Sequence, residues 1–523
     1  MGRAVTEIVI VGGGTAGWLA ACRIAARVAT SGQAGLSVTL IESPDVPTIG
    51  VGEGTWPTMR HTLERIGISE AEFLASCDAS FKQGSAFKGW CTGEPNDIYY
   101  HPFVLPPASD PSDLLGAWQA DTQSRAFADA VCPQPDLCRQ NLAPRQRQMP
   151  DYAGALNYAY HLDAVKLAAL LMRHGKDRLG IRHVRDHVTS VIRAPDGDIL
   201  AVETRTAGPI AGDLFLDCTG HAALLIGSHY GVPLIDRTDQ LFNDRALAIQ
   251  VKVAPDSPIA SQTNATAHSA GWIWDIGLPT RRGIGCVYSS AHMSDNDAAE
   301  TLDAYLKREA PWASLDSLSA RHLTFRSGHR ERFWERNCLA IGLSAGFLEP
   351  LEASAIVLVE LSVDALLDNF PATRGVMDIH ARRFNDQFRY RWDRIVEFLK
   401  LHYVLSQREA PYWRDHRDLA SIPDRLKDQL AIWRHQPPSA YDLSSVQEVF
   451  PAASYQYVLY GMGFPAPIDG PIPPQDTQSA VRALLQVETR KRQLVSSMPT
   501  NRTYLDALRA SQNPSHSHTE MMP

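Results

Sequence analysis

Two lysines, Lys82 and Lys88, lie in the stretch DASFKQGSAFKGW (78–90), among three aromatic residues and two glycines. A lysine ammonium can donate a hydrogen bond to a bound reagent, and a lysine amine can act as a nucleophile where desolvation lowers its pKa. Most lysines do neither, because they are solvated surface charges on apolar stems. The rest of the chain therefore has to show whether either lysine takes part in chemistry.

Carboxylates and tryptophans supply two further candidate groups. The segment NCLAIGLSAGFLEPLEASAIVLVE (337–360) predicts a strand, a loop carrying Glu349 and Glu352, and the start of an apolar helix. A carboxylate can polarise a neighbouring reagent and accept a proton. The segment GWIWDIGLP (271–279) places Trp272 and Trp274 on one face of a strand, because strand side chains alternate. Such a pair on a strand is also compatible with ordinary core packing.

The N-terminal elements predict a dinucleotide-binding fold. A β-branched run, EIVIV, leads into a glycine-rich turn and an Ala/Leu/Ile pattern of helical period. Gly12, Gly14 and Gly17 match G-x-G-x-x-G, in which the glycines permit a tight turn, close approach to a pyrophosphate and close helix packing. The next strand, LSVTLIES, ends at Glu42, which is placed to accept a hydrogen bond from a ribose hydroxyl.

Later elements complete this picture. TIGVGEGTWP (48–57) is a glycine-dense loop whose backbone can come close to a flat ring. Residues 92–155 predict long irregular loops. HVTSVIRA and ILAVETRT predict a hairpin around Asp196-Gly197. A further strand before Asp217 is typical of a return to a flavin site. The C-terminal third predicts helices, with an apolar core stripe at Phe384, Phe388, Trp392, Ile395 and Leu399.

Composition excludes several classes of protein. The chain has 523 residues, of which 44% are hydrophobic and 21% charged, and a formal net charge of −8, so nucleic acid and anionic membranes are not expected partners. The eight cysteines are scattered without a C-x-x-C pair, which predicts neither a metal site nor a disulfide framework. No apolar run approaches about 18 residues, and the first residues lack the layout of a signal peptide. These features predict a cytoplasmic protein.

The order and content of these stretches, together with FKQGSAFKGW and HYVLSQREAPYW (402–413), resemble the flavin-dependent tryptophan halogenases over nearly the whole chain, to about Arg414. The resemblance implies an α/β fold, with a FAD-binding Rossmann-like core of the two-dinucleotide-binding, hydroxylase-like type and an added, largely helical substrate domain. We expect residues 1–90 and 151–360 to form the core, 91–150 and 361–510 the substrate region, and 511–523 a disordered tail.

The resemblance also implies a reaction and its catalytic residues. In this family, reduced FAD and O2 oxidise chloride or bromide to hypohalous acid, which halogenates an electron-rich arene by electrophilic aromatic substitution; the cofactor carries the hard step. The family's catalytic lysine follows a phenylalanine and precedes, by five and eight residues, a phenylalanine and a tryptophan. Lys82 has this spacing and Lys88 does not. The family's glutamate follows Pro-Leu, which indicates Glu352 and leaves Glu349 a structural role.

Other positions are assigned by the same resemblance, beside the glycine motif. His101 and Phe103 fall where the family sandwiches the indole ring, with Glu352 also facing the substrate; Ser354 and Ala355 fall at the halide site. Trp272 and Trp274 are expected to stand along the tunnel between flavin and substrate. The expected cofactor contacts are Gly12, Gly14, Thr15, Ala16, Gly17, Glu42, Ser43, Val46, Glu53, Gly54, Val188, Asp217, Leu343 and Ile356.

Departures from the family pattern bear on the substrate. Members acting on free tryptophan carry Pro-Leu-Glu-Ser-Thr-Gly, where this chain has PLEASA, and they carry a Phe-Trp pair that VFPAASYQYVLYGMGF (449–464) lacks. A site without partners for the α-amino and carboxylate groups suggests a substrate without them. We therefore expect indole or another electron-rich arene rather than free tryptophan.

Two other interpretations and the partners complete the sequence-based picture. A flavin-dependent aromatic monooxygenase shares the glycine motif but has no need of Lys82, Glu352 or the tryptophan pair. A non-catalytic flavin-binding or redox-sensing protein leaves the same residues unexplained. No second nucleotide-binding motif is visible, so we expect a separate NAD(P)H-dependent flavin reductase to supply FADH2 to a monomer or homodimer.

Overall fold

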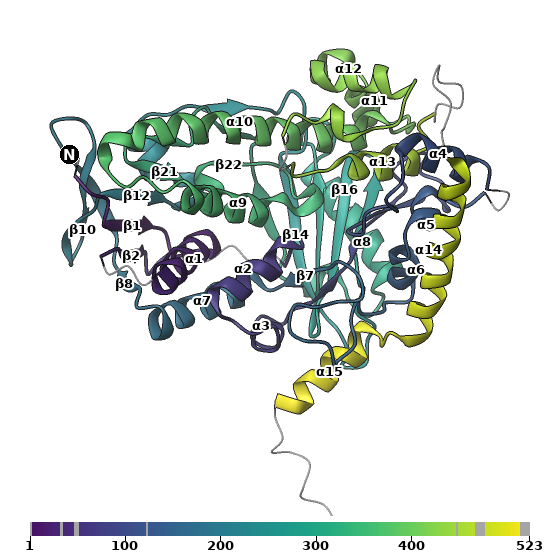
Figure 1. The fold of residues 1–523 in the computed structure, drawn as a ribbon, viewed down its shortest axis with the longest axis horizontal. Helices are drawn as coiled ribbons and strands as arrows, with labels where there is room; N and C mark the ends of the chain where they lie inside the picture. Colours follow the sequence, from purple (N-terminus) through teal and green to yellow (C-terminus); the bar gives the residue numbers. More distant parts are fainter. Residues whose placement is uncertain are drawn as a thin grey trace, which may run out of the picture. The chain divides into compact units, whose positions relative to one another are not determined.

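The computed structural model describes residues 3–31, 35–46, 52–121, 124–445, 448–465 and 476–512 (Figure 1). The chain divides into two compact units, each assembled from separate segments. Unit 1 comprises Met1–Ser69, Asp163–Asp244 and Thr324–Leu399. Unit 2 comprises Glu70–Leu162, Arg245–Leu323 and Lys400–Pro523. None of the described helices is long and apolar enough to cross a membrane.

Unit 1 is built on a six-stranded sheet in the order β20-β21-β12-β1-β2-β8. Its strands are β1 (Glu7–Val11), β2 (Ser37–Glu42), β8 (Arg182–Arg185), β12 (Leu214–Asp217), β20 (Trp334–Glu335) and β21 (Cys338–Ala340). All neighbours are parallel except β20 and β21. Four of the five β1 residues are buried, as expected for a central strand of a parallel sheet covered by helices.

The helices of unit 1 pack around α1. They are α1 (Thr15–Ser31), α2 (Thr58–Ile66), α7 (Ala164–Arg178), α9 (Ser354–Asp368) and α10 (Arg374–Val404). Helix α1 contacts α2, α7 and α9, and Figure 1 shows α7 and α9 on either side of it. On α10 the predicted apolar stripe is buried from Phe384 to Leu399, which confirms its assignment to the core.

A small antiparallel sheet stands at the edge of unit 1. Strands β9 (Val188–Arg193), β10 (Ile199–Thr204) and β11 (Gly208–Ala211) form it, and the turn between β9 and β10 is closed by the Ala194 N–H donating to Asp198 O at 2.8 Å. The predicted hairpin is therefore confirmed.

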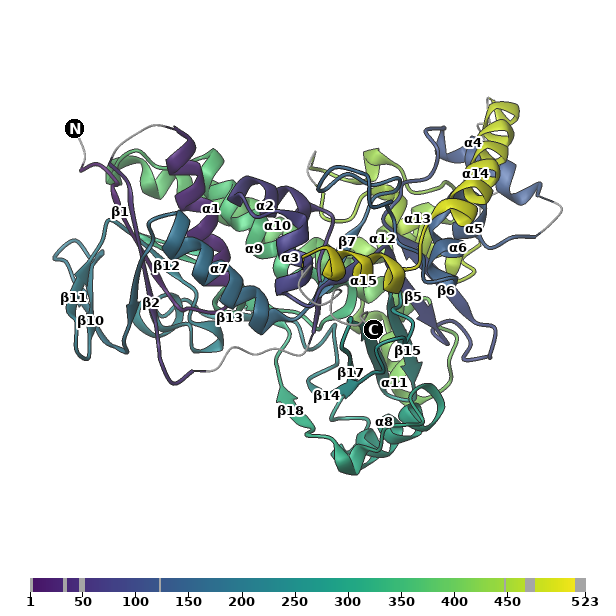
Figure 2. The ribbon, with the colours of Figure 1, turned by 90° about the horizontal axis from the view of Figure 1, so that it is seen from below.

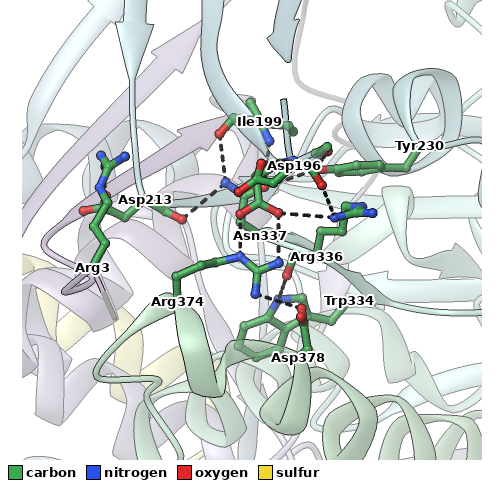
Figure 3. A network of polar contacts seen from close by, with 12 residues as sticks. Arg3, Asp196, Ile199, Asp213, Tyr230, Trp334, Arg336, Asn337, Arg374 and Asp378 are labelled. Atoms are coloured by element: carbon green, nitrogen blue, oxygen red, sulfur yellow. Dashed lines mark hydrogen bonds and ion pairs between the residues drawn. The ribbon is translucent and has the colours of Figure 1, made fainter. Parts of the chain in front are cut away.

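Asn337 ties this small sheet to the parallel sheet (Figure 3). Its side-chain oxygen accepts from the Ile199 N–H at 2.9 Å and from the Tyr230 hydroxyl at 3.0 Å. Its amide nitrogen donates to the carbonyls of Ile199 at 2.9 Å and Asp213 at 3.3 Å. Because Asn337 is only 2% exposed, these hydrogen bonds form away from water and fix the end of β10 against β12.

Unit 2 contains a seven-stranded sheet in the order β18-β14-β17-β16-β15-β5-β6 (Figure 2). The strands are β5 (Gly84–Lys88), β6 (Ile98–Pro102), β14 (Arg245–Lys252), β15 (Thr263–His268), β16 (Gly271–Gly277), β17 (Arg281–Tyr288) and β18 (Arg321–Thr324). Only β5 and β15 are paired in parallel among those with a described register. A short antiparallel ladder of β4 (Ser80–Lys82) and β7 (Ala159–Leu162) belongs to the same unit.

Helices complete unit 2. They are α3 (Glu70–Ser76), α4 (Pro111–Gln119), α5 (Phe127–Val131), α6 (Gln134–Arg139), α8 (Asp295–Glu309), α11 (Pro411–His416), α12 (Asp424–Trp433), α13 (Ala452–Gly461), α14 (Thr477–Ser497) and α15 (Asn501–Gln512). Helix α14 runs along α4, α5 and α6, as Figure 2 shows. Helix α13 packs against β6.

The units differ from the predicted boundaries in a way that strand pairing explains. Residues 70–90, 151–162 and 245–323, predicted as part of the core, belong to unit 2, and 361–399, predicted as part of the substrate region, belong to unit 1. Pairing of β5 with both β6 and β15 joins segments far apart in sequence into one sheet. The region 92–155, predicted as irregular loops, contains β6 and the three helices α4, α5 and α6. Residues 511–512, predicted as part of a disordered tail, end α15, whereas 513–523 lie outside the described residues.

Candidate active site

The glycine-rich turn after β1 has the geometry of a phosphate cradle. Gly12 has φ +117°, and a Cβ there would lie 2.1 Å from the carbonyl oxygen of Cys218. A Cβ on Gly17 would lie 1.9 Å from the Gly12 oxygen, whereas a Cβ on Gly14 would meet nothing within 4 Å. Two of the glycines thus permit close packing, and the third leaves open space at the N-terminus of α1. The turn fits the pyrophosphate of a dinucleotide.

Glu42 closes β2 beside this turn. A Cβ on Gly13 would overlap the Glu42 side chain, so the carboxylate lies directly against the cradle. His183 Nε2 is 2.8 Å from Glu42 Oε2 and holds it in place, while burial lowers the pKa of His183. This position suits a ribose-binding acid. Sequence reasoning missed His183, because only the parallel pairing of β2 with β8 brings it to Glu42.

Two predicted flavin contacts, Ser43 and Val188, lie beside His187, a residue that the sequence alone does not single out. His187 Nδ1 is 3.1 Å from Ser43 Oγ, and its Nε2 is 2.8 Å from the Asp45 carboxylate. Val188 follows His187 directly, and Val46 is 73% exposed at the end of the same described segment. Residues 48–51 of the predicted glycine-dense loop lie outside the described residues.

Asp217 shapes the turn after β12. Its side chain is fully buried, and one carboxylate oxygen accepts from the Thr219 N–H and hydroxyl at 3.0 and 2.6 Å. The other oxygen accepts from the N–H groups of Leu225 and Ile226, both at 2.8 Å. Both oxygens accept hydrogen bonds within the chain, so Asp217 positions the backbone that packs on Gly12. Its predicted contact with the cofactor stays a prediction.

The first turn of α1 also contacts other predicted cofactor positions. Thr15 Oγ1 donates to the Ala164 carbonyl at 3.5 Å. A Cβ on Gly342 would lie 2.8 Å from the Cβ of Ala16, so the turn carrying Leu343 lies against the start of α1.

On the short strand β3 (Glu53–Gly54), burial raises the pKa of Glu53 to about 7. A protonated carboxyl group of this kind can donate a hydrogen bond near neutral pH.

Glu352 lies in a strained turn immediately before α9. Glu352 and Ala353 have φ of 63° and 54°, a left-handed conformation that costs on the order of 1–3 kcal/mol for each residue other than glycine. Glu352 is 7% exposed, and Ser354 and Ile356 are buried, whereas Ala355 is exposed at the first turn of the helix. N–H groups at a helix start lack intrahelical acceptors, so this turn fits an anion.

The two glutamates of this loop, Glu352 and Glu349, have different hydrogen-bond partners. The Trp56 indole Nε1 donates to the Glu352 carbonyl oxygen at 2.9 Å and so holds the strained turn. The sequence alone gives Trp56, at the end of the glycine-dense loop, no role. Glu349 instead accepts a hydrogen bond from the buried Asn243 side chain, which agrees with the structural role predicted for it.

In unit 2 the two lysines of the stretch 78–90 differ in burial. Lys82 on β4 is 1% exposed and lies opposite the small Ala159 of β7. Its Nζ is 5.4 Å from the centre of the Phe103 ring, a cation–π distance. Lys88 at the end of β5 is half-buried. Burial therefore favours Lys82 as the lysine with a chemical role.

His101, a predicted arene-binding residue, lies on one face of the seven-stranded sheet. His101, Ser85 and Thr263 form one row across β6, β5 and β15. Tyr99, Phe87, Ala265, Trp274 and Gly285 form the next row, two residues further along each strand, and so face the same side.

Helix α13 closes over His101. Ser454 Oγ is 2.9 Å from His101 Nε2, and the rings of Phe450 and Tyr457 lie 6.4 and 6.2 Å from the His101 ring. The Tyr457 hydroxyl donates to Val104 O at 2.8 Å and ties the helix to the end of β6. The sequence alone identifies the segment 449–464. It does not single out Phe450, Ser454 and Tyr457 within it, because no charged side chain there marks a binding position.

The predicted tryptophan pair lies on this same face. The rings of Trp272 and Trp274 are 6.4 Å apart, and Trp90 is 6.2 Å from Trp272. A Cβ on Gly285 would overlap the Trp274 ring, so that ring lies flat across β17. The Trp274 Nε1 has no hydrogen-bond partner among the described residues. The Gly277 carbonyl, at the end of β16, accepts from Ser80 Oγ at 2.6 Å.

The predicted site residues are shared between the units. Unit 2 brings together Lys82, His101, Phe103, Trp272 and Trp274. Unit 1 holds Glu352, the proposed halide positions and all the predicted flavin contacts. The proximity of Lys82 to Glu352 stays a prediction.

Known proteins are similar to this chain over most of its length. The family model for tryptophan halogenase matches residues 7–472. A tryptophan 6-halogenase of Streptomyces toxytricini is 33% identical, with 96% of this chain and 98% of the relative covered.

Two solved structures are also similar. The crystal structure of a tryptophan halogenase from Shewanella frigidimarina superposes with a TM-score of 0.93 at 48% identity, covering 97% of this chain and 98% of the other. The tryptophan C-6 flavin-dependent halogenase (chlorinase) from taromycin biosynthesis superposes with a TM-score of 0.89 at 32% identity, covering 97% and 100%.

The Rossmann-like cradle fits a dinucleotide cofactor, and the similarity to these halogenases places the chain among the flavin-dependent enzymes. Within them, the chain belongs to the tryptophan halogenase family. The predicted family and the predicted α/β fold with a FAD-binding core are confirmed. The hydroxylase interpretation is not favoured.

The cradle geometry leads to a direct test of FAD binding. Gly14→Val should leave the protein folded, because a Cβ there meets nothing, but should weaken FAD binding by about tenfold or more, because the side chain would fill the pyrophosphate space. Flavin fluorescence titration and the melting temperature measure the two effects. Gly12→Val is the matched variant and should lower the melting temperature. Wild-type FAD affinity in Gly14→Val would place the pyrophosphate elsewhere.

Proposed function

We propose that the protein is a FADH2-dependent halogenase acting on indole or a similar electron-rich arene that lacks the charged end of free tryptophan. The observation that carries this proposal is a lysine, Lys82, buried to 1% exposure and facing an aromatic cluster. Burying an amine away from water is unfavourable, so a lysine in this position calls for a function. Family membership supplies the reaction class.

The proposed roles follow from the chemistry of each group. Bound FAD, once reduced and exposed to O2, supplies the oxidising power that converts halide into hypohalous acid. Ser354 and Ala355 at the start of α9 would hold the halide. The Lys82 amine would bind the hypohalous acid by donating a hydrogen bond or would carry the halogen itself. Glu352 would polarise the same species and accept the proton that leaves the halogenated ring.

The aromatic cluster would orient the ring. His101 and Phe103 present flat faces, and the hydrogen bond to Ser454 limits rotation of the His101 ring. Fixing one ring carbon toward Lys82 would determine which position is halogenated, because regiochemistry here depends mainly on orientation. The Trp272 and Trp274 rings would line the path between flavin and substrate and exclude water from it.

The substrate proposal rests on what α13 offers. The segment 449–464 contains aromatic, amide and hydroxyl groups but no charged side chain. The α-amino and carboxylate groups of free tryptophan would therefore lose water without gaining an ionic partner from this segment, which opposes binding.

The catalytic proposal predicts a specific loss. With FAD, a flavin reductase, O2, bromide or chloride and indole, the wild type should give halogenated indole detectable by mass spectrometry. Lys82→Ala should lower its formation by about two orders of magnitude or more, while FAD binding and hydrogen peroxide release continue. Lys88→Ala is the matched control and should retain activity. Equal loss in both lysine variants would contradict the assignment of Lys82, and a hydroxylated product would contradict the reaction.

The substrate proposal predicts a preference. Indole should be halogenated with a kcat/KM about tenfold or more above that of free tryptophan, since only the latter leaves charged groups unpaired. Competition between the two substrates in one reaction, resolved by chromatography, measures the ratio. Equal or faster turnover of free tryptophan would overturn this part of the proposal.

The source of reduced flavin gives a separate prediction. We infer that a diffusible NAD(P)H-dependent reductase supplies FADH2, since only one nucleotide-binding motif occurs in the chain. The purified protein with FAD and NADH alone should leave the flavin absorbance unchanged under anaerobic conditions. Addition of a reductase should bleach it and, on admission of O2 and halide, start product formation. Bleaching by the protein alone would refute the inference.

A further inference from the structure

The β4–β7 ladder presents two very different faces. In its register, Ser80 lies opposite His161 and Lys82 lies opposite Ala159. Side chains directly opposite each other in a ladder point to the same side, and so do residues two apart. Ser80, Lys82, Ala159 and His161 therefore share one face. Lys82 and His161 are diagonal neighbours on it, a spacing that long side chains can bridge.

This face is turned toward the aromatic face of the seven-stranded sheet. His161 Nε2 is 2.8 Å from Thr263 Oγ1, and Thr263 lies in the same row as His101. The Gln83 N–H, directly after Lys82, donates to Ser261 O at 2.7 Å and anchors the end of β4 just before β15. His161 thus lies between the lysine and the wall of the proposed arene site.

His161 is completely buried and uses only one of its two ring nitrogens within the described residues. Its exposed fraction is 0%, and its Nδ1 has no hydrogen-bond partner in the described part of the chain. A buried polar atom without a partner is unusual in a folded protein and is often associated with function. The bond to Thr263 fixes the ring plane, so Nδ1 is held in a set direction.

The charge on His161 is set by its surroundings. Burial lowers the pKa of His161 well below its usual value, and the nearby Lys82 lowers it further. The imidazole is therefore neutral near pH 7, and the electrostatic interaction agrees with the diagonal placement of the two side chains. A neutral imidazole presents one donor nitrogen and one acceptor nitrogen.

Resting on the proposed function, we infer that His161 is a positioning residue for Lys82. Its Nδ1, which lacks a partner among the described residues and is held in direction by the bond to Thr263, is available to accept a hydrogen bond from the Lys82 amine when the halogenating species is bound. His161 contacts neither flavin nor halide in this role and carries no covalent step. Loss of its Nδ1 should lower kcat for halogenation and leave KM for the arene nearly unchanged.

A competing interpretation is that His161 is a packing residue whose one requirement is the hydrogen bond to Thr263. Two amide variants separate the interpretations. Asn places its amide near the position of Nδ1 but is too short to reach Thr263, whereas Gln reaches the position of Nε2 and offers nothing at Nδ1. If positioning through Nδ1 matters, the shorter amide is the better substitute; if packing matters, the longer one is.

The experiment measures kcat and KM for indole with the full-length protein, FAD, reductase, O2 and bromide. His161→Gln should lower kcat by about tenfold or more, as expected for a misplaced reacting group, and His161→Asn by about threefold or less, with KM for indole unchanged in both. Thr263→Val, which keeps the ring but removes its anchor, should lower kcat in the same direction. FAD affinity and peroxide release should match the wild type.

Folding is controlled separately. His174→Gln removes another buried histidine, whose Nε2 is 2.9 Å from Ile66 O in unit 1, and it should not change kcat. Melting temperatures are compared for all variants. If both His161 variants fail to fold, Thr263→Val carries the test, because full activity in that variant would show that the direction of the His161 ring does not matter.

The outcomes distinguish the inference from the proposed function. Wild-type kcat in His161→Gln, or a greater loss in His161→Asn than in His161→Gln, would overturn the positioning role and leave the halogenase proposal standing. A wild type that halogenates no arene while it binds FAD and releases peroxide would overturn the proposed function itself. A change in KM for indole with kcat unchanged would also contradict the positioning role.

Discussion

The antiparallel pairing of β4 with β7 is the constraint on which the proposed arene site depends. One register places Ser80, Lys82, Ala159 and His161 on the side of the large sheet. The other side carries Phe81, Tyr158 and Tyr160 in edge-to-face contact, and both tyrosine hydroxyls donate to the buried Glu70 at 2.6 Å. A slip of one residue would exchange these faces, putting the lysine into the aromatic core and aromatic rings into the site. The buried Glu70–Arg145 pair helps to exclude that alternative.

In unit 1 the proposed binding sites are formed mainly by backbone groups, whereas in unit 2 they are formed mainly by side chains. The positive φ of Gly12 and its contact with the backbone after Asp217 form a cradle that side chains would only obstruct. The turn at Glu352 and Ala353 extends the same principle, since two left-handed residues aim the carboxylate and open the start of α9. The hydrogen bond from Trp56 compensates part of that strain. Backbone sites suit phosphate and halide, which need N–H donors more than a shaped pocket.

The proposed arene site would be selective through what it lacks. Helix α13 offers Ser454 to His101 and ring surface from Tyr457, and no charge. An apolar arene gains from such surroundings, whereas a zwitterion is penalised for its lost hydration. Burial away from water also keeps His161 neutral beside Lys82. Under the proposed function, burial rather than a set of specific contacts would connect the choice of substrate to the protonation state of His161 beside Lys82.

The sequence by itself determined the local features: the glycine turn at Gly12, Gly14 and Gly17, and the hairpin around Gly197. Each follows from steric rules or spacing within a few residues, which folding elsewhere does not change. Tertiary structure decided the rest. Pairing of β5 with β15 moved residues 245–323 into unit 2, and His161, Ser454 and Trp56 gained their roles only through contacts across long stretches of chain. Partners so far apart leave no periodic trace in the sequence, because burial and strand register arise only when the whole sheet forms.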